Sequence, residues 1–331
     1  MIFAFFQVLA TFLAYLTSVQ KNEYTYKKVG DIKLDLVVYQ PTYNTSAINK
    51  LSSPVLLAIH GGGFVFGEKD GEGAISDREI KEFASRGWTI VSINHRLAPP
   101  SFLSDIVQDM QAAYKWIKNK LPAKNLSAVD PDLVCVFGKS AGGGLALMGG
   151  KHLHPRFPCI ISFYPYGASL LDNDFYDPTT SPSEELVAAV KRLKAVTIES
   201  PRSKLPTDDR NTVFKLSIKE KKGGWLLATH NPKEDPKIVR ARLKEWSPID
   251  NIDQHYPPTW LAHGMDDSLV PYEQSVKMKE KLEKHNRAVV LDLPPNEGHV
   301  FDERGGESVW KNHVIPALDW AAIQIQNYKR E

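Results

Sequence analysis

The chain has 331 residues, of which 42% are hydrophobic and 10% aromatic, so it can build one large domain with an insertion, or two domains. Its 41 basic and 39 acidic residues leave a formal charge of +2, which excludes the strongly basic surface of a typical nucleic-acid-binding protein. Small molecules are therefore the expected partners.

The N-terminal segment IFAFFQVLATFLAYLTSV, from Ile2 to Val19, is apolar and about as long as the roughly 20 residues that cross a bilayer, but Gln7 and Thr11 interrupt it. No Lys or Arg precedes it and no small-x-small cleavage site ends it, which makes it a poor secretory signal. Three interpretations remain: a helix packed on the domain, an anchor at a membrane surface, or an atypical secretion signal. We favour the first two together, which predicts an intracellular protein whose residues 1–21 contact a membrane.

Beyond residue 22, strand and helix patterns alternate. Residues 24–29 and 32–39 alternate in polarity around Gly30 and Asp31, which predicts an antiparallel hairpin. Helical spacing is found at residues 77–85, 102–120, 141–152, 272–285 and 309–328. Six runs between them are short, apolar and β-branched, as in buried parallel strands: PVLLAIH, WTIVSIN, DLVCVFG, CIISFYP, TWLAHG and AVVLDL. This order predicts an α/β fold with a mostly parallel sheet and right-handed crossovers.

One long interval breaks this alternation. About ninety residues separate the strand that ends near Tyr166 from the one that begins at Thr259, several times a normal loop. Within it, SEELVAAVKRLKAV and KIVRARLKEWS have helical spacing, and Ser183 is placed to cap the first. We therefore expect a mostly helical cap at about residues 167–257, inserted into an α/β domain of residues 22–331.

The chain has two cysteines, Cys135 and Cys159, and each lies in an apolar, strand-like run. Two buried thiols are the expected state, in preference to a disulfide framework or a metal site.

The stretch VFGKSAGGGLALMGG places Ser140 among glycines, after a strand and before a helix. Gly138 to Gly142 match G-x-S-x-G, the pattern of a nucleophile elbow, in which small residues allow a strained turn to present a serine hydroxyl. The alternative is a glycine-rich helix start with an incidental serine. A phosphate-binding loop is excluded because G-x-x-x-x-G-K-[ST] is not matched.

A serine nucleophile also needs donors for the oxyanion that forms on attack. HGGGF, residues 60–64, follows the strand PVLLAI, and its glycines let backbone N–H groups face a substrate oxygen. Gly62 and Gly63, with the N–H of Ala141, are the expected donors. The alternative is a plain glycine turn after a strand.

The base and its orienting acid are expected later in the chain, in the order Ser, acid, His. HGMDDSLVP offers Asp266 and Asp267 after one strand, and PPNEGHVF offers His299 in the loop after the last strand. His299 is the expected base, although a surface loop and an ordinary turn would explain the same residues. His60 and His263 end strands and have structural interpretations.

HGGGF, GKSAGG, HGMDDSLVP and EGHVF, in this order, resemble the α/β-hydrolase superfamily, and most of all the esterases related to hormone-sensitive lipase. The resemblance implies an α/β-hydrolase fold with a helical cap. It also implies that Asp267, four residues after the histidine of its motif, is the acid, and that Gly62, Gly63 and Ala141 form the oxyanion hole.

Two positions depart from the family pattern. The residue before the serine is Lys139 where an Asp is usual, which predicts either a surface salt bridge or a cleft that favours anionic substrates. HRLAPP stands where the family has Y-R-L-A-P-E, and we expect an Arg96 to Asp109 pair behind the cleft.

Together these features predict a serine hydrolase that cleaves small to medium carboxylic esters through an acyl-enzyme, without a metal or organic cofactor. Aromatic residues beside the catalytic loops are expected to line an apolar substrate pocket under the cap: Phe64, Phe66, Tyr164 and Tyr166. A lactone, lactam or amide hydrolase would use the same chemistry. A non-catalytic binding protein is the alternative from a different class, because a fold does not imply an activity.

Overall fold

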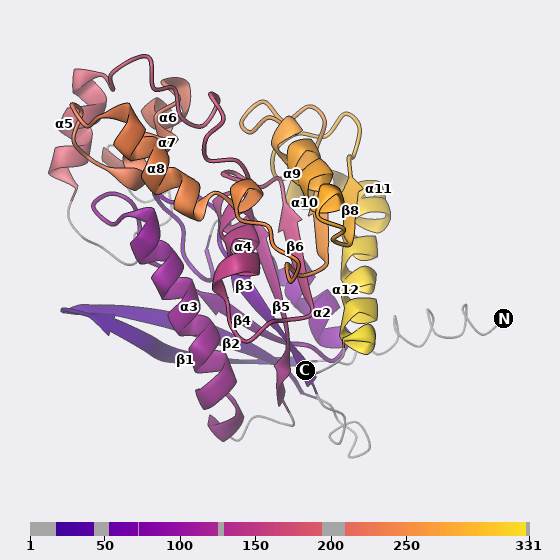
Figure 1. Ribbon diagram of the computed structural model, residues 1–331. Coiled ribbons are helices and arrows are strands. Elements are labelled where there is room, and N and C mark those ends of the chain that lie inside the picture. The colour runs from indigo at the N-terminus through magenta and orange to yellow at the C-terminus, as the bar shows by residue number, and fades with distance from the viewer. Residues whose placement is uncertain (1–17, 43–52, 72, 125–128, 194–208, 329–331) are drawn as a thin grey trace.

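The computed structural model describes residues 18–42, 53–71, 73–124, 129–193 and 209–328, and within them eight strands form one sheet (Figure 1). The strand order is β1-β2-β4-β3-β5-β6-β7-β8; β1 and β2 pair antiparallel, β2 joins β4 antiparallel, and all later pairs are parallel. This confirms the predicted mostly parallel sheet. The strands are β1 (Ser18–Val29), β2 (Ile32–Thr42), β3 (Ser53–Ile59), β4 (Thr89–Ile93), β5 (Val129–Lys139), β6 (Cys159–Phe163), β7 (Thr259–Ala262) and β8 (Val289–Asp292).

The first hairpin is longer than the sequence pattern indicated. β1 begins at Ser18, so the last two residues of the apolar N-terminal segment belong to a strand that pairs with Pro41 and Thr42. The rest of that segment lies outside the described residues. In the described residues, no helix is both long and apolar enough to cross a membrane.

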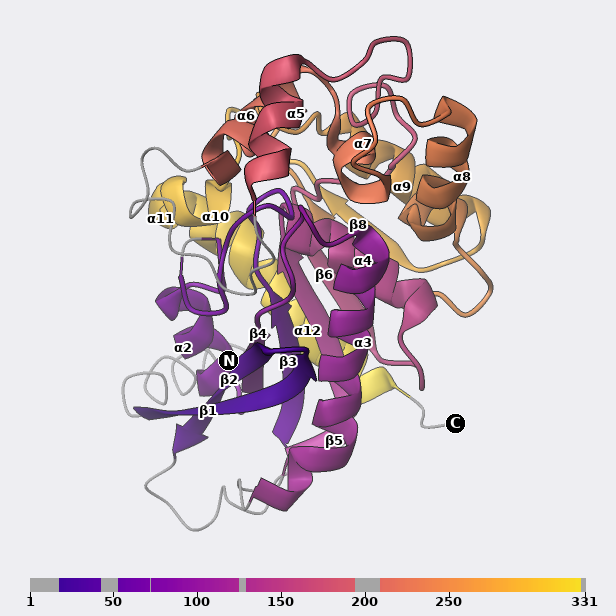
Figure 2. The same ribbon diagram turned by 90° about the vertical axis from the view of Figure 1, so that its left-hand side faces the viewer.

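Helices cover both faces of the sheet (Figures 1 and 2). Successive residues of a strand point to opposite faces, so Leu57 packs with α3 and α4 whereas Leu56 packs with α2 and α12. Burial on both faces explains the continuous apolar runs of the central strands. The covering helices are α2 (Asp77–Ser85), α3 (Leu103–Lys120), α4 (Ala141–His152), α9 (Glu273–Lys284) and α12 (Ile315–Asn327).

The long interval between β6 and β7 contains four α-helices and one short 3₁₀ helix in its described part, and the four α-helices gather at one end of the sheet (Figure 2). Ser183 caps the first of them by accepting a hydrogen bond from the Leu186 N–H, as its position in the sequence predicted. These helices are α5 (Glu184–Arg192), α6 (Asp209–Lys219), α7 (Gly223–Ala228) and α8 (Pro236–Trp246).

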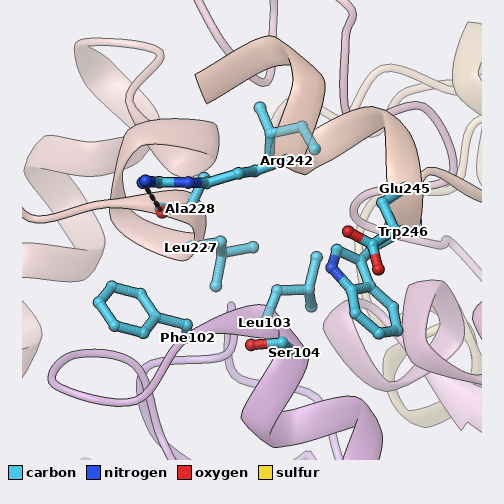
Figure 3. A pocket seen from close by; sticks show the side chains of 9 residues that line it. Phe102, Leu103, Ser104, Leu227, Ala228, Arg242, Glu245 and Trp246 are labelled. Atoms are coloured by element: carbon cyan, nitrogen blue, oxygen red, sulfur yellow. Dashed lines mark hydrogen bonds between the residues drawn. The ribbon is translucent and has the colours of Figure 1, made fainter. Parts of the chain in front are cut away.

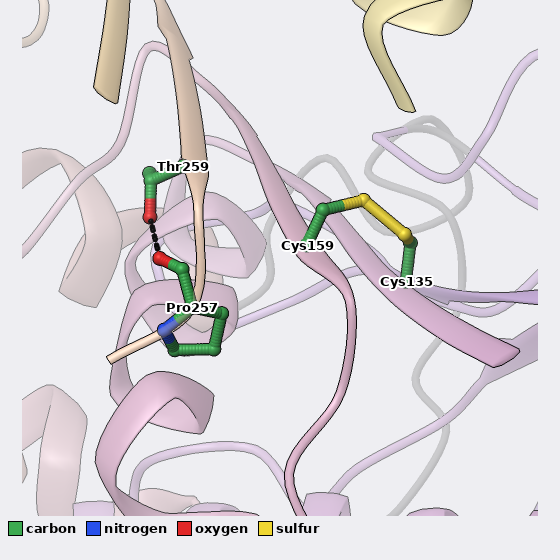
Figure 4. Close-up of a disulfide and its surroundings, with 4 residues drawn as sticks. All are labelled: Cys135, Cys159, Pro257 and Thr259. Carbon is green, nitrogen blue, oxygen red and sulfur yellow. Dashed lines mark hydrogen bonds between the residues drawn. A yellow bond between two sulfur atoms is a disulfide. The ribbon is translucent and has the colours of Figure 1, made fainter. Parts of the chain in front are cut away.

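A disulfide joins Cys135 and Cys159, so the expectation of two free thiols is wrong (Figure 4). The two residues are direct partners in the β5–β6 register, their Cα atoms are 4.8 Å apart, and both face the α2 and α12 side of the sheet. The sequence does not reveal this pairing, because a helix separates the strands and leaves their register unspecified.

Candidate active site

Ser140 occupies the sharp turn between β5 and α4, with φ 52° and ψ −121°. A positive φ is unfavourable for serine, and such strain persists only where the surroundings impose it. Here the Ser140 N–H donates to the Phe163 carbonyl (2.9 Å), and the Ser140 carbonyl accepts from Gly144 (3.0 Å) and Tyr166 (2.9 Å). Backbone hydrogen bonds to β6, to α4 and to the loop after β6 therefore hold the turn in its strained form.

Steric constraints require glycine at several positions around Ser140. A Cβ atom at Gly138 would lie 2.0 Å from the Gly142 carbonyl oxygen, and one at Gly142 would lie 2.2 Å from the Ile59 carbonyl oxygen. At Gly144 it would lie 2.2 Å from the Tyr166 carbonyl oxygen. The start of α4 thus packs backbone against backbone, and no larger residue fits without moving a strand or loop.

The side chains of Ser140, His299 and Asp267 form a hydrogen-bonded chain. His299 Nε2 lies 3.1 Å from Ser140 Oγ, and His299 Nδ1 lies 2.7 Å from Asp267 Oδ2. A carboxylate can only accept, so Nδ1 carries a hydrogen and Nε2 is free to accept the proton of Ser140. The structure thus brings together three residues that are 159 and 32 positions apart in the sequence.

Asp267 is well suited to remain ionised beside the imidazole. Burial alone would raise the pKa of Asp267, but hydrogen bonds from His263 and His299 outweigh it and hold that pKa well below its usual range. Backbone N–H groups of Leu269 and Val270 donate to its other oxygen, each at 2.9 Å. The neighbouring Asp266 is exposed. Of the two adjacent aspartates, Asp267 is therefore the one in contact with the histidine.

The proposed oxyanion loop borders the same cavity as Ser140. Gly62 and Gly63 line its wall and have positive φ values of 99° and 62°. The Gly62 carbonyl accepts from the N–H groups of Val65 and Phe66, which closes the loop on itself. Ala141 is the first residue of α4, so its N–H is one of the four that a helix start leaves without an intrahelical acceptor. This arrangement suits the binding of a negatively charged oxygen.

The cavity beside Ser140 has a volume of about 120 Å³ and mainly apolar walls. Phe66 and Tyr164 line it as predicted, but Phe64 and Tyr166 do not: they are buried and pack against each other with ring centroids 6.2 Å apart. Regular alternation would place residues two positions apart on the same face, but Phe64 and Tyr164 have positive φ values of 65° and 38°, so these loops do not alternate regularly. Further lining residues, none of them predicted to contact substrate, are Gly61, Gly73, Lys139, Phe214, Leu269, Val300, Glu303 and Arg304.

Phe214 comes from cap helix α6, and only the folded chain places it here. Its ring stacks edge to face on Phe66 (centroids 4.8 Å) and lies 2.5 Å from where a Cβ atom of Gly63 would stand. Four residues earlier in the same helix, Arg210 is buried and donates to the carbonyls of Val65 (2.8 Å) and Pro99 (3.1 Å). The cap is thus attached directly to the glycine loop.

The expectation of a surface salt bridge at Lys139 is wrong, because its side chain is 2% exposed and surrounded by carboxylates. Its Nζ lies 2.7 Å from Glu79, 2.5 Å from Asp302 and 3.1 Å from Glu303. The ammonium is therefore buried and paired with carboxylates, although Lys139 also lines the cavity beside Ser140. Burial raises the pKa of Glu79 to about 7, with Lys139 opposing that rise and Asp302 adding to it.

Other departures from the expected motif serve the scaffold. Arg96 pairs with the buried Asp109 (Nε to Oδ2, 2.8 Å), which confirms the predicted pair. His95, the residue before it, stacks on His60 at the start of the glycine loop, with ring centroids 4.3 Å apart.

A larger hollow, about 400 Å³, lies between the start of α3 and cap helices α7 and α8 (Figure 3). Leu103, Leu227 and Trp246 line it, and its Arg242 donates to the Ala228 carbonyl (3.1 Å). None of the three residues of the hydrogen-bonded chain borders it. Size alone would therefore select the wrong cavity as the reactive site.

Comparison with known proteins gives consistent relatives. The family model described as BD-FAE matches residues 36–282. The chain is 28% identical to the probable carboxylesterase M8 of Phoma sp. over 91% of this chain and 92% of that protein. It is 26% identical to the probable carboxylic ester hydrolase LipM of Mycobacterium tuberculosis, over 77% of this chain and 51% of LipM. A non-reducing polyketide synthase of Stachybotrys bisbyi, stbA, is 25% identical over 96% of this chain, which spans only 15% of that synthase.

Solved structures share the fold. A truncated carbohydrate esterase from gut microbiota superimposes with a TM-score of 0.61 at 17% identity, covering 94% of this chain and 98% of that one. A bacterial heroin esterase gives a TM-score of 0.61 at 20% identity, covering 97% and 90%. Both have the sheet flanked by helices that is described above.

Proposed function

The chain belongs to the BD-FAE family and is an α/β-hydrolase that acts on carboxylic esters, and we propose that it cleaves small to medium esters through an acyl-enzyme on Ser140. The observation that supports this mechanism most is the pair of hydrogen bonds that links Ser140 to His299 and His299 to Asp267. Ser140 itself lies at a strained turn that borders a cavity.

In the proposed reaction, His299 Nε2 takes the proton of Ser140 Oγ as that oxygen attacks the ester carbonyl. N–H groups at Gly62, Gly63 and Ala141 stabilise the oxyanion, and removal of one such donor typically costs roughly 3 to 4 kcal/mol of barrier. His299 then gives its proton to the leaving alcohol. Water repeats the sequence on the acyl-enzyme and regenerates Ser140.

The cavity supports small to medium substrates. The cavity has a volume of about 120 Å³. The glycine loop forms one of its walls, and the Phe66 and Phe214 rings form another. The cavity walls are mainly apolar, and the charged residues among them, Lys139, Glu303 and Arg304, include both signs, which favours an uncharged ester.

Labelling with a fluorophosphonate probe tests the proposal. The wild-type protein should be modified at Ser140, and the Ser140→Ala variant should not. A panel of acyl esters, lactones and amides then ranks the substrate classes. If the wild-type protein resists the probe while folded, Ser140 is not an activated nucleophile and the proposed acyl-enzyme mechanism is wrong.

A further inference from the structure

His263, the residue that follows β7, contacts the acid of the site directly. Its side chain is fully buried, and its Nε2 lies 3.1 Å from Asp267 Oδ2, the same oxygen that accepts from His299. The sequence interpretation of His263 as a residue that only ends a strand is therefore incomplete.

The surroundings of His263 fix the position of its hydrogen. Nε2 also lies 3.0 Å from the Val270 carbonyl oxygen, which can only accept, so Nε2 carries the hydrogen. In the neutral ring Nδ1 then lacks one and accepts from the hydroxyl of Ser275, at 2.8 Å on helix α9. His263 thus presents one N–H, shared between Val270 and Asp267.

This N–H completes the set of donors around Asp267. A carboxylate has about four acceptor sites. Leu269 and Val270 donate to Oδ1, while His299 and His263 donate to Oδ2. Removing the His263 donor would leave Oδ2 bound only to His299, so the backbone donors at Oδ1 alone would orient the carboxylate, and Oδ2 could shift and carry the imidazole with it.

We propose that His263 is a positioning residue for the reaction: its Nε2–H, oriented by Ser275, locks the Asp267 carboxylate in the plane that aims His299 at Ser140. This inference rests on the proposed function of the three residues. His263 touches neither the cavity nor Ser140, so its effect passes entirely through Asp267.

Leucine and glutamine at position 263 separate positioning from packing. His263→Leu keeps an apolar body of similar size and removes the donor, whereas His263→Gln keeps an N–H near the place of Nε2. A displacement of about 1 Å can cost roughly 100-fold in rate, so we expect a loss of that order in kcat for His263→Leu with little change in KM. His263→Gln should regain most of it. Ser275→Ala is a milder variant and should lose less.

A double-mutant cycle with Asp267→Asn is the decisive measurement. If His263 acts through Asp267, His263→Leu should cost almost nothing further once Asp267 is changed. A multiplicative loss in the double variant would overturn the proposal, as would equal rates for the leucine and glutamine variants. His152→Leu is a matched control on α4, where the imidazole packs on Trp246 instead, and its turnover should be unchanged.

The rate of fluorophosphonate labelling at Ser140 keeps this test independent of substrate identity. If wild-type protein is not labelled, the proposed function fails. If it is labelled and folded His263→Leu is labelled equally fast, the function stands and the role of His263 is wrong. Should His263→Leu not fold, the comparison of Ser275→Ala and His263→Gln with wild type decides the question.

Discussion

Lys139 and Ser140 are neighbours in sequence but lie in very different electrostatic environments. The ammonium of Lys139 is buried among three carboxylates from α2 and from the segment after His299, whereas the hydroxyl of Ser140 meets one imidazole at the edge of an apolar cavity. A charge next to a nucleophile in sequence therefore says little about the charge in the cleft. We expect the first residue to act on stability and the second on chemistry, and variants of each can break or sharpen that division.

The largest effect is expected at the nucleophile itself. Ser140→Ala or His299→Ala should each lower turnover by about 10⁶-fold, and the double variant should be no slower, because the residues act in one step. Ester hydrolysis and urea unfolding should be measured on the same samples. Multiplicative losses, or a large loss of stability, would show that position 140 does not have a purely chemical role.

The second-largest effect is expected for Asp267→Asn, which should lower turnover by about 10⁴-fold, since an amide favours the wrong tautomer of His299. Asp266→Asn is the matched control, because its side chain is exposed one residue away, and it should change turnover little. The opposite ranking would make Asp266 the acid.

Lys139→Met tests the other half of the comparison. It leaves Glu79 and Asp302 buried without their cation, which should lower the free energy of unfolding by about 3–5 kcal/mol at pH 8. The control is Lys151→Met, whose exposed pair with Asp253 should be worth no more than about 1 kcal/mol. Equal urea midpoints for the two variants would contradict the structural role of Lys139.

The smallest effect concerns the pH dependence of stability. The pKa of Glu79 is raised from 4.5 to about 7, so the folded protein binds more protons here than the unfolded chain between those values. This carboxyl therefore stabilises the fold at low pH, and its contribution falls as pH rises from about 4.5 to 7, by at most about 1.4 kcal/mol per pH unit.

Glu79→Gln removes that titration, so the unfolding free energy of the variant should fall less than that of wild type between pH 5 and pH 7.5. Asp267 does not interfere with this measurement. Its pKa is lowered, so its contribution to stability is lost as pH falls, and this happens below pH 5. Parallel pH profiles for both proteins would show that Glu79 is ionised throughout.

Local patterns were enough to predict most elements of the sheet, Ser140 and His299, but they left Asp266 and Asp267 as alternatives, and only the family resemblance selected Asp267. Apolar runs marked the buried strands, and the G-x-S-x-G and H-G-x-x-D motifs marked turns whose residue types carry their own physical reason. Contacts set by packing were not predictable. The register that opposes Cys135 to Cys159, the approach of Phe214 to Gly63 and the carboxylates around Lys139 all join segments far apart in sequence. The direction of Phe64 and Tyr166 was missed for the same reason.

The backbone contacts at the start of α4 have a consequence for attempts to make this protein more heat-resistant. Replacing a helical glycine by alanine commonly adds roughly 0.5–1 kcal/mol, because it restricts the unfolded chain. At Gly142 and Gly144 the new methyl group would meet carbonyl oxygens at 2.2 Å, so the usual substitution would force the elbow apart. Even Gly150, near the other end of the helix, would meet the Tyr256 ring at 2.4 Å. Engineering for heat resistance should leave this helix unchanged and turn to exposed positions remote from it.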